Sequence, residues 1–373
     1  MAKIILVSKH VNATSWQLAQ ALKSQQHEVV LLTSHGENLD NHDTNGIEFM
    51  GYFKRWSLLE GLRIIPGLFG LQPQILHLVL DEDKMNAAQM ILSTFAKSHP
   101  TCVLTTSLLN IRHGLTRRNP VRYLIEESDI ITCPTVEALG QLRGLDVRST
   151  RQGRGILPPV LDLKNETPKA MVYSDEEEDQ LLHNLAKTPY VVVPFRETKF
   201  NPESDSFVRI RTIAQKYKVV LWGSYSHWSL RDRKKFAAWM DEFQCGHHWT
   251  VTGDLPSHLS RSLLEKSTAF VLAGQPLSPV EMTEYYMRAI QCHSVLILDS
   301  KQTSVHSDLW KNTVNCWVLN HHHLQKDLVK LLAKPHLKLP ESLSEQLAED
   351  RHLIDSSLNE LNRLYNKALN HLR

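Results

Sequence analysis

Charged side chains follow two apolar segments of the sequence that have the pattern of buried β-strands. Arg196 and Lys199 come directly after the run 190–193, and Glu281 follows the run 269–273 and a polar loop. Two cations at a strand end can neutralise a diphosphate, each charged hydrogen bond contributing about 1.5 to 3 kcal/mol. A carboxylate accepts hydrogen bonds from sugar or ribose hydroxyls, and a helix N-terminus offers free N–H groups to phosphate. Together these side chains predict a site for a ligand that carries phosphate and hydroxyl groups.

Each of these side chains also has a structural alternative. Arg196 and Lys199 fit a solvated surface turn. Glu281 and Glu284 are three residues apart, share roughly one helix face, and would stabilise the helix N-terminus by their charge alone. Arg288, one turn later, could pair with either carboxylate. The sequence leaves these alternatives open.

Composition and charge place the chain among ordinary globular proteins. Of its 373 residues 42% are apolar and 22% charged, and the net charge of +2 gives no argument for nucleic acid as a partner. The five cysteines are scattered, odd in number and without CxxC spacing, which favours free thiols in a reducing cytoplasm. Neither a signal peptide nor an uncharged apolar run of roughly 18 residues is visible. We therefore expect a cytoplasmic protein that contacts the inner membrane face at most as a peripheral protein.

Apolar strands alternate with amphipathic helices along the chain. In the first half the pattern predicts strands at 4–7, 28–33, 47–52, 75–79, 102–105 and 130–133, with helices at 16–24, 58–65, 86–97 and 135–142. In the second half it predicts strands at 190–193, 218–222, 248–252, 269–273 and 295–298, with helices at 206–217, 231–243, 258–266 and 341–372. Such alternation builds parallel sheets with helices on both faces. The expected fold class is therefore α/β, with two Rossmann-like doubly wound domains.

The segment Gly253 to Ser300 resembles the donor-binding half of GT-B fold glycosyltransferases of the retaining, family 4 kind, the glycosyl transferases group 1. The family motif places one Glu in the loop and another eight residues later on the helix. Glu281 matches the first place approximately, and Arg288 or Ala289 occupies the second. The resemblance implies two domains that face a cleft: an acceptor domain at 1–160, a hinge at 161–187, a nucleotide-sugar-binding domain at 188–340 and a helix at 341–373 that packs back on the first domain.

The resemblance also implies roles for particular residues. In the second domain Arg196 and Lys199 would grip the donor diphosphate, and Glu281 would orient the donor. The other implied donor-binding residues are Gly223, Ser224, Asp254, Leu255 and Glu284. In the first domain the implied acceptor-binding or phosphate-binding residues, which stand where relatives carry paired glycines, are Lys9, His10 and Asn12. The implied catalytic residues are Glu281 and His113, and a surface histidine is the alternative for His113.

The implied activity is transfer of a hexose from a nucleotide-diphosphate donor to a glycan or lipid-linked acceptor, as in polysaccharide biosynthesis. The resemblance implies neither a cofactor nor a metal. Four family features are altered: the glycine loop, the His after the fifth strand, the Asn-Gly turn where this chain has Pro159, and the second Glu. A catalytically inactive GT-B protein used for binding or as a scaffold is therefore the alternative. A nicotinamide dehydrogenase is not favoured, because no GxGxxG follows a predicted strand.

Two further features allow more than one interpretation. Tyr52–Trp56 combines aromatic and basic residues ahead of an apolar helix, a mixture typical either of a peripheral membrane surface or of a core helix. The triplet His321–His323 and the pair His247–His248 lack partner ligands at metal-binding spacing, so we expect surface loops there.

Overall fold

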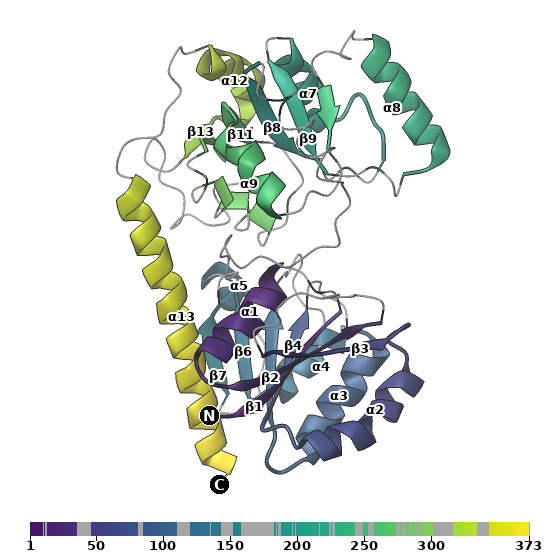
Figure 1. Cartoon of the computed structure of the whole chain (residues 1–373), viewed down its shortest axis with the longest axis vertical. Helices are drawn as coiled ribbons and strands as arrows, with labels where there is room; N and C mark the ends of the chain where they lie inside the picture. The colour runs from purple at the N-terminus through teal and green to yellow at the C-terminus, as the bar shows by residue number, and fades with distance from the viewer. Residues whose placement is uncertain are drawn as a thin grey trace. The chain divides into compact units, whose positions relative to one another are not determined.

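The computed structural model divides the chain into two compact units, which are described one at a time. The first unit holds Met1–Ala170 and Asp350–Arg373, and the second holds Met171–Glu349. Helices and strands carry the labels of Figure 1. The structure describes residues 1–9, 11, 13–35, 46–80, 85–109, 120–134, 136–142, 152–157, 183, 185, 188–195, 197, 199–215, 217–223, 225, 228–242, 249–252, 257–273, 277, 281–282, 285–286, 288–289, 292, 294–300, 316–333 and 343–372.

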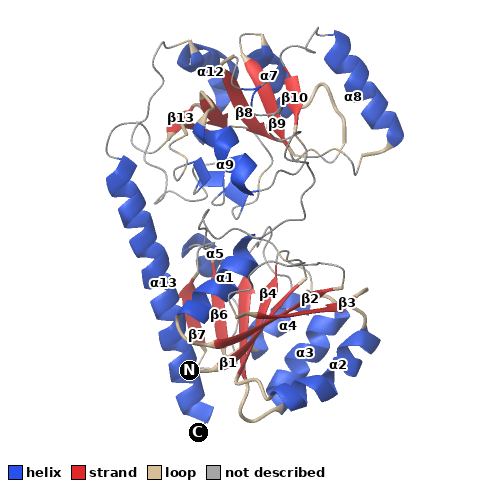
Figure 2. Ribbon diagram, viewed as in Figure 1, coloured by secondary structure: helices blue, strands red, loops and turns tan. Residues whose placement is uncertain are grey.

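The first unit is built on a parallel sheet of seven strands (Figure 2). These are β1 (Lys3–Ser8), β2 (Glu28–Ser34), β3 (Glu48–Phe53), β4 (Ile75–Leu80), β5 (Val103–Leu108), β6 (Ile130–Cys133) and β7 (Gly153–Ile156). Their order in the sheet is β3-β2-β1-β4-β5-β6-β7, and every pair is parallel. All six residues of β4 and of β5 are buried, as expected of strands covered by helices on both faces.

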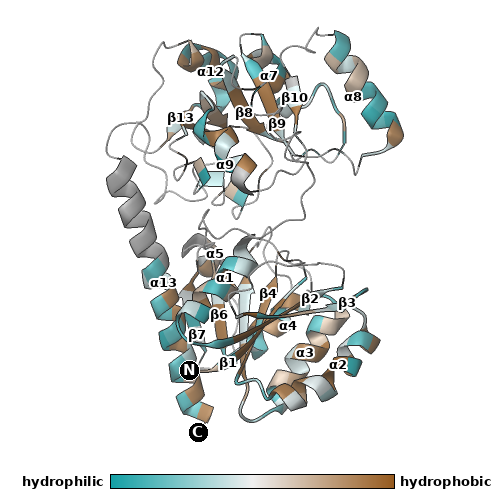
Figure 3. Cartoon of the chain, viewed as in Figure 1, coloured by the Kyte–Doolittle hydropathy of each residue, from teal (hydrophilic) through white to brown (hydrophobic). Residues whose placement is uncertain are grey.

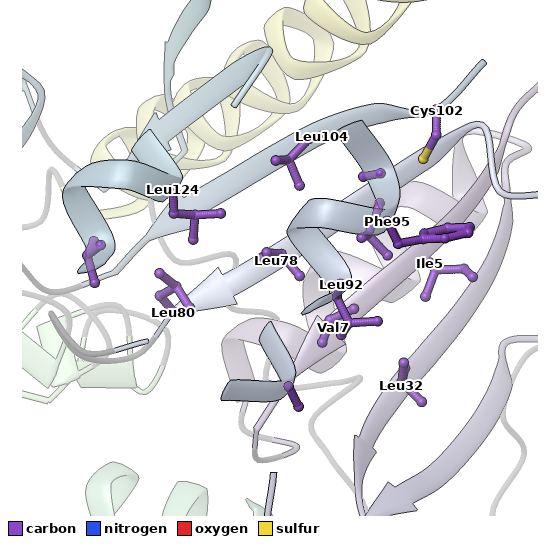
Figure 4. Close-up of a cluster of buried hydrophobic side chains, with 14 of the residues drawn as sticks. Ile5, Val7, Leu32, Leu78, Leu80, Leu92, Phe95, Cys102, Leu104 and Leu124 are labelled. Atoms are coloured by element: carbon purple, nitrogen blue, oxygen red, sulfur yellow. The ribbon is translucent and has the colours of Figure 1, made fainter. Parts of the chain in front are cut away.

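The helices of the first unit that precede its long C-terminal helix follow individual strands. They are α1 (Ala13–Ser24), α2 (Leu58–Leu71), α3 (Ala87–Ser98), α4 (Pro120–Glu127) and α5 (Val136–Gln141). Ser57 and Asn86 begin α2 and α3 with capping boxes that use Glu60 and Gln89. Between these helices and the sheet lies a core of buried hydrophobic side chains (Figure 4). Cys102 in this core is a free thiol, and burial raises its pKa to about 12.

The C-terminal helix α13 (Leu343–Leu372) is tied to the sheet of the first unit by buried polar contacts. The Tyr365 hydroxyl lies 2.6 Å from His77 Nδ1, and His77 Nε2 lies 2.6 Å from Ser107 Oγ. Because His77 is fully buried, desolvation lowers its pKa to about 3, so it is neutral at physiological pH. At the sheet edge, Leu364 packs against Gly153 of β7, where an added Cβ would come within 3.0 Å of it.

The second unit holds a parallel sheet of six strands. These are β8 (Tyr190–Pro194), β9 (Lys218–Trp222), β10 (Trp249–Val251), β11 (Ala269–Val271), β12 (Leu296–Asp299) and β13 (Trp317–Leu319). The order is β10-β9-β8-β11-β12-β13. Its described helices are α7 (Asp205–Ala214), α8 (Leu230–Glu242), α9 (Ser257–Glu265), η3 (His321–His323) and α12 (Leu324–Leu332). The middle residues of β8 and β9 are hydrophobic (Figure 3) and buried, as expected of strands covered on both faces of the sheet.

Two doubly wound parallel sheets confirm the predicted fold class, and several elements correct the predicted pattern. The helix expected at 58–65 runs on to Leu71 with Pro66 inside it. The strands β7 and β13 and the helices α4 and α12 were not predicted. The triplet His321–His323 is a short 3-10 helix leading into α12 rather than a surface loop, while His247–His248 lies outside the described residues.

Candidate functional site

The candidate site lies at the carboxyl edge of the second sheet, where the strand order reverses. From β8 the chain moves outward to β9 and β10, then returns to the other side of β8 at β11. The loops that follow β8 and β11 therefore diverge, and in doubly wound sheets this switch point is where ligands bind. Lys199 follows β8 and is exposed, while Glu281 follows β11 and is half-buried. The topology thus places the predicted cation and the predicted carboxylate after neighbouring strand ends.

Gly223, directly after β9, lies against the backbone of Phe195, the residue that follows β8. Its φ of +149° is a conformation that side-chain-bearing residues rarely adopt, and an added Cβ would lie 2.2 Å from the Phe195 carbonyl oxygen. The Phe195 N–H donates to the Trp222 carbonyl at 2.8 Å. The close contact at this glycine is with the backbone of the residue after β8, and the donor-binding role of Gly223 stays a prediction.

The loop between β8 and α7 is anchored on both sides of Lys199. Phe195 and Phe200 insert into an aromatic cluster with Phe207, Trp228 and Phe236, at ring-centroid distances of 5.2 to 6.4 Å. The Trp228 Nε1–H donates to the Glu197 carbonyl at 2.6 Å. A loop fixed in this way presents its exposed lysine from a defined backbone, which lowers the entropic cost of binding an anion.

The helical residues after β11 show which positions face the sheet. Met282, Tyr285, Tyr286 and Ala289 are buried, at the spacing of one helix face. The Tyr285 ring packs on Trp222 at 5.5 Å. Ala289, eight residues after Glu281, is therefore a core residue.

Arg288 lies on a different side of the same helical segment. Its guanidinium carbon is 5.5 Å from the centre of the Trp222 ring, a cation–π contact. Its Nη1 is 3.4 Å from Ser260 Oγ of α9. A cation thus stands beside the strand end that leads into Gly223, close to where the resembling family carries its second acid. The sequence analysis considered Arg288 as a replacement for the second acid and as an ion-pair partner of Glu281 or Glu284. It did not predict the contact with Trp222, for which the tryptophan that ends β9 was the available signal.

The first unit has the same topological reversal, between β1 and β4. Lys9 follows β1 there and is exposed. Its carbonyl oxygen accepts a hydrogen bond from Ser34 Oγ at 2.5 Å, which fixes the start of the loop against the end of β2. The predicted site residues that lie outside the described part of the chain are His10, Asn12, His113, Arg196, Ser224, Asp254, Leu255 and Glu284.

A pocket of about 340 Å³ lies near the ends of β12 and β13 and contains none of the predicted donor residues. Among its lining side chains are Asp205, Arg209 and His321. Arg209 is buried, donates from Nε to the Asp205 carbonyl at 2.8 Å, and has its pKa lowered by desolvation, with Asp205, Asp299 and Glu197 opposing that shift. His321 Nδ1 is 3.6 Å from Asp299 Oδ2. These carboxylates offset the positive charge, so the switch point remains the stronger candidate site.

No helix in the described ranges is both long and apolar enough to cross a membrane. The described His, Cys, Asp and Glu side chains include no group of three placed to hold a metal ion.

The fold has close counterparts among solved structures. A sucrose-phosphate synthase from Thermosynechococcus elongatus superposes with a TM-score of 0.68 at 14% identity, over 98% of this chain and 99% of that one. HepE from Anabaena, solved in complex with UDP, gives 0.63 at 9% identity over 100% and 99%. A UDP-N-acetylglucosamine 2-epimerase gives 0.59 at 13% identity over 94% and 90%. The chain therefore has the GT-B fold, as the resemblance of its sequence implied. No protein-family model and no curated protein sequence matches it.

Proposed function

We propose that this chain is a glycosyltransferase that moves a sugar from a nucleotide-diphosphate donor to a glycan or lipid-linked acceptor. The observation that carries the proposal is that Lys199 and Glu281 follow neighbouring strands at the switch point of the second sheet. That arrangement offers a cation to phosphate and a carboxylate to hydroxyl groups. The GT-B fold supports the proposal, because solved proteins of this fold include a complex with UDP.

In this proposal the second unit binds the donor and the first unit binds the acceptor. Arg196 and Lys199 stabilise the diphosphate as negative charge develops on the leaving group. Gly223, Ser224, Asp254 and Leu255 line the nucleotide end, with Glu284 beside Glu281. The first unit receives the acceptor through Lys9, His10 and Asn12, with His113 near the transferred sugar. Acceptor delivery at a membrane surface would suit a lipid-linked substrate.

A binding or scaffold protein without catalysis is the second candidate. Two observations favour it: Ala289 is fully buried, and Arg288 stacks on Trp222. The position eight residues after Glu281 therefore supplies no acid, and the half-buried residue beside it, Arg288, is a cation. A protein of this kind would bind a nucleotide sugar and leave it intact.

Turnover measurements on the wild-type chain separate these candidates. The protein is incubated with a panel of nucleotide sugars, each with and without glycan and lipid-linked acceptors. Release of nucleoside diphosphate together with a glycosylated acceptor supports transfer. Tight donor binding without any product supports the binding protein. The proposal would be contradicted if the protein bound none of the donors. It would also be contradicted if the product were an epimerised donor, which is the product expected of the epimerase that shares this fold.

A further inference from the structure

The helix α2 turns apolar side chains toward solvent as well as toward the core. Of the large apolar side chains exposed in the described part of the chain, four lie on this helix: Leu58 at 45%, Leu59 at 63%, Leu62 at 49% and Phe69 at 55%. Single exposed leucines are common on protein surfaces, but a cluster on one helix marks an interaction surface.

These four side chains form one continuous stripe, which we call the α2 outer face. At about 100° per residue, Leu58, Phe69, Leu62 and Leu59 fall within a sector of roughly 100°. The residues of the opposite sector, Gly61, Ile64 and Leu68, are buried against the domain core. The outer face therefore points away from most of the packing face. Phe69 marks its edge, since this ring is 55% exposed and also packs on Phe95 of α3 at 5.2 Å.

The exposed charged side chains named around the α2 outer face are basic, and the acidic residue of α2 is engaged with the backbone. Lys54 and Arg55 precede the helix and are exposed, and Arg63 is exposed beside Leu59 and Leu62. The one carboxylate in α2, that of Glu60, accepts hydrogen bonds from the backbone N–H groups of Lys54, Arg55 and Ser57, each at 3.1 Å. The neighbouring helix α3 contains no acidic residue.

The aromatic residues of the preceding segment belong to the core. Trp56 is 5% exposed, stacks on Phe53 at 4.2 Å, and donates from its indole N–H to Ser34 Oγ at 2.8 Å. The apolar part of the surface is thus made by the leucines and Phe69, not by Trp56. Substitutions on the outer face can therefore be made without disturbing this packing.

We propose that the α2 outer face docks on the surface of an anionic lipid bilayer, with the helix lying in the plane of the interface. Leucine and phenylalanine side chains would enter the boundary between headgroups and acyl chains, and the basic side chains would pair with anionic headgroups. A symmetric contact with a second copy of this chain would set Lys54, Arg55 and Arg63 against their own like charges. The inference goes beyond the proposed transfer reaction and rests on the surface of α2 alone, so either can fail without the other.

Vesicle cosedimentation tests the proposal. Wild type is mixed with vesicles of phosphatidylcholine alone and of phosphatidylcholine with phosphatidylglycerol. We expect wild type to bind the vesicles that contain phosphatidylglycerol more strongly than those of phosphatidylcholine alone. High salt should weaken this binding. The Leu59→Ser/Leu62→Ser variant should bind them at least about 10-fold more weakly, because two apolar side chains are removed from the contact. The Lys54→Glu/Arg63→Glu variant should lose the preference for anionic lipid.

Leu230→Ser is the matched control, because Leu230 is also a leucine exposed at 63% near the start of a helix, in the second unit. It should bind vesicles as the wild type does. Circular dichroism checks folding, and donor affinity, measured in parallel, should be unchanged in all variants. The proposal is overturned if wild type stays in the supernatant with both vesicles, or if Leu230→Ser loses as much binding as Leu59→Ser/Leu62→Ser. A wild-type dimer that Leu59→Ser/Leu62→Ser dissociates would overturn it in favour of self-association.

Discussion

The Phe195 carbonyl oxygen occupies the space that a side chain at Gly223 would need. An added Cβ at this glycine would stand 2.2 Å from that oxygen, and the backbone there has a φ of +149°. The contact joins the ends of β8 and β9 at Phe195, four residues before Lys199. A contact between backbone atoms thus fixes the two strand ends beside the candidate donor site.

Gly223→Ala should destabilise the second unit by more than about 2 kcal/mol, because it combines a steric clash with an unfavourable backbone conformation. Urea unfolding measures this. The control is Gly67→Ala: Gly67 lies in α2 with nothing within 4 Å of an added Cβ. That change should stabilise the chain by up to about 1 kcal/mol. Similar free energies of unfolding for the two variants would mean that the contact at Phe195 is absent.

Trp228→Phe should weaken donor binding about 5-fold while the protein stays folded. The phenyl ring remains in the aromatic cluster, but the Glu197 carbonyl loses the indole N–H at 2.6 Å, a bond contributing about 1 kcal/mol. Calorimetric donor titration is the measurement. Trp239 of α8 packs on the Phe207 ring of the same cluster at 5.4 Å. Trp239→Phe makes the same change there and should lower stability without lowering affinity. Equal donor affinities for the two variants would show that donor binding does not depend on the hydrogen bond from Trp228 to the loop that carries Lys199.

Ala289→Glu should destabilise the fold by about 3 kcal/mol or more, because it places a carboxylate at a position with no exposed surface. Arg288→Glu should change stability by no more than about 1 kcal/mol, since it replaces a cation–π contact beside Trp222. Denaturant midpoints compare the two. The reverse order of stabilities would place position 289, rather than 288, toward the ligand.

His77 should make the first unit less stable in acid. Its pKa is lowered from 6.5 to about 3 by burial, so between these values the unfolded chain binds a proton that the folded chain does not. The stability that depends on neutral His77 is complete above about pH 6.5 and is lost as pH falls toward 3, at up to about 1.4 kcal/mol per pH unit. His77→Gln removes this titration. The difference in free energy of unfolding between wild type and His77→Gln should therefore shrink from pH 7 to pH 4; parallel curves would contradict the assignment.

Most strands could be predicted from the sequence because they are continuous apolar runs. The strand β6 (Ile130–Cys133) has the predicted bounds, and so does β9 (Lys218–Trp222). The strand β7 was missed because its sequence is GRGI, and the structure supplies the reason: Leu364 of α13 packs where side chains at Gly153 and Gly155 would stand. Pro66 and Gly67 indicated an end to α2, yet tertiary packing of Ile64 and Leu68 carries the helix to Leu71.

The candidate site could be predicted only in outline. Strand-end position is readable from the sequence, which is why Lys199, Gly223 and Glu281 could be proposed as site residues. The orientation of the helix after β11 depends on tertiary contacts, so the stacking of Arg288 on Trp222 was not predicted. The anchoring of the Lys199 loop by Trp228 joins residues 31 positions apart and has no local signal.

Donor titration of the Arg196→Ala/Lys199→Ala variant tests the central claim most directly. Wild type, this variant and an Arg231→Ala/Lys235→Ala control on α8, which removes the same charge from exposed positions, are titrated with a panel of nucleotide sugars by calorimetry. The account predicts that wild type binds at least one donor, that the control binds it equally well, and that Arg196→Ala/Lys199→Ala binds it at least about 100-fold more weakly. Unchanged affinity in the folded Arg196→Ala/Lys199→Ala variant would contradict it.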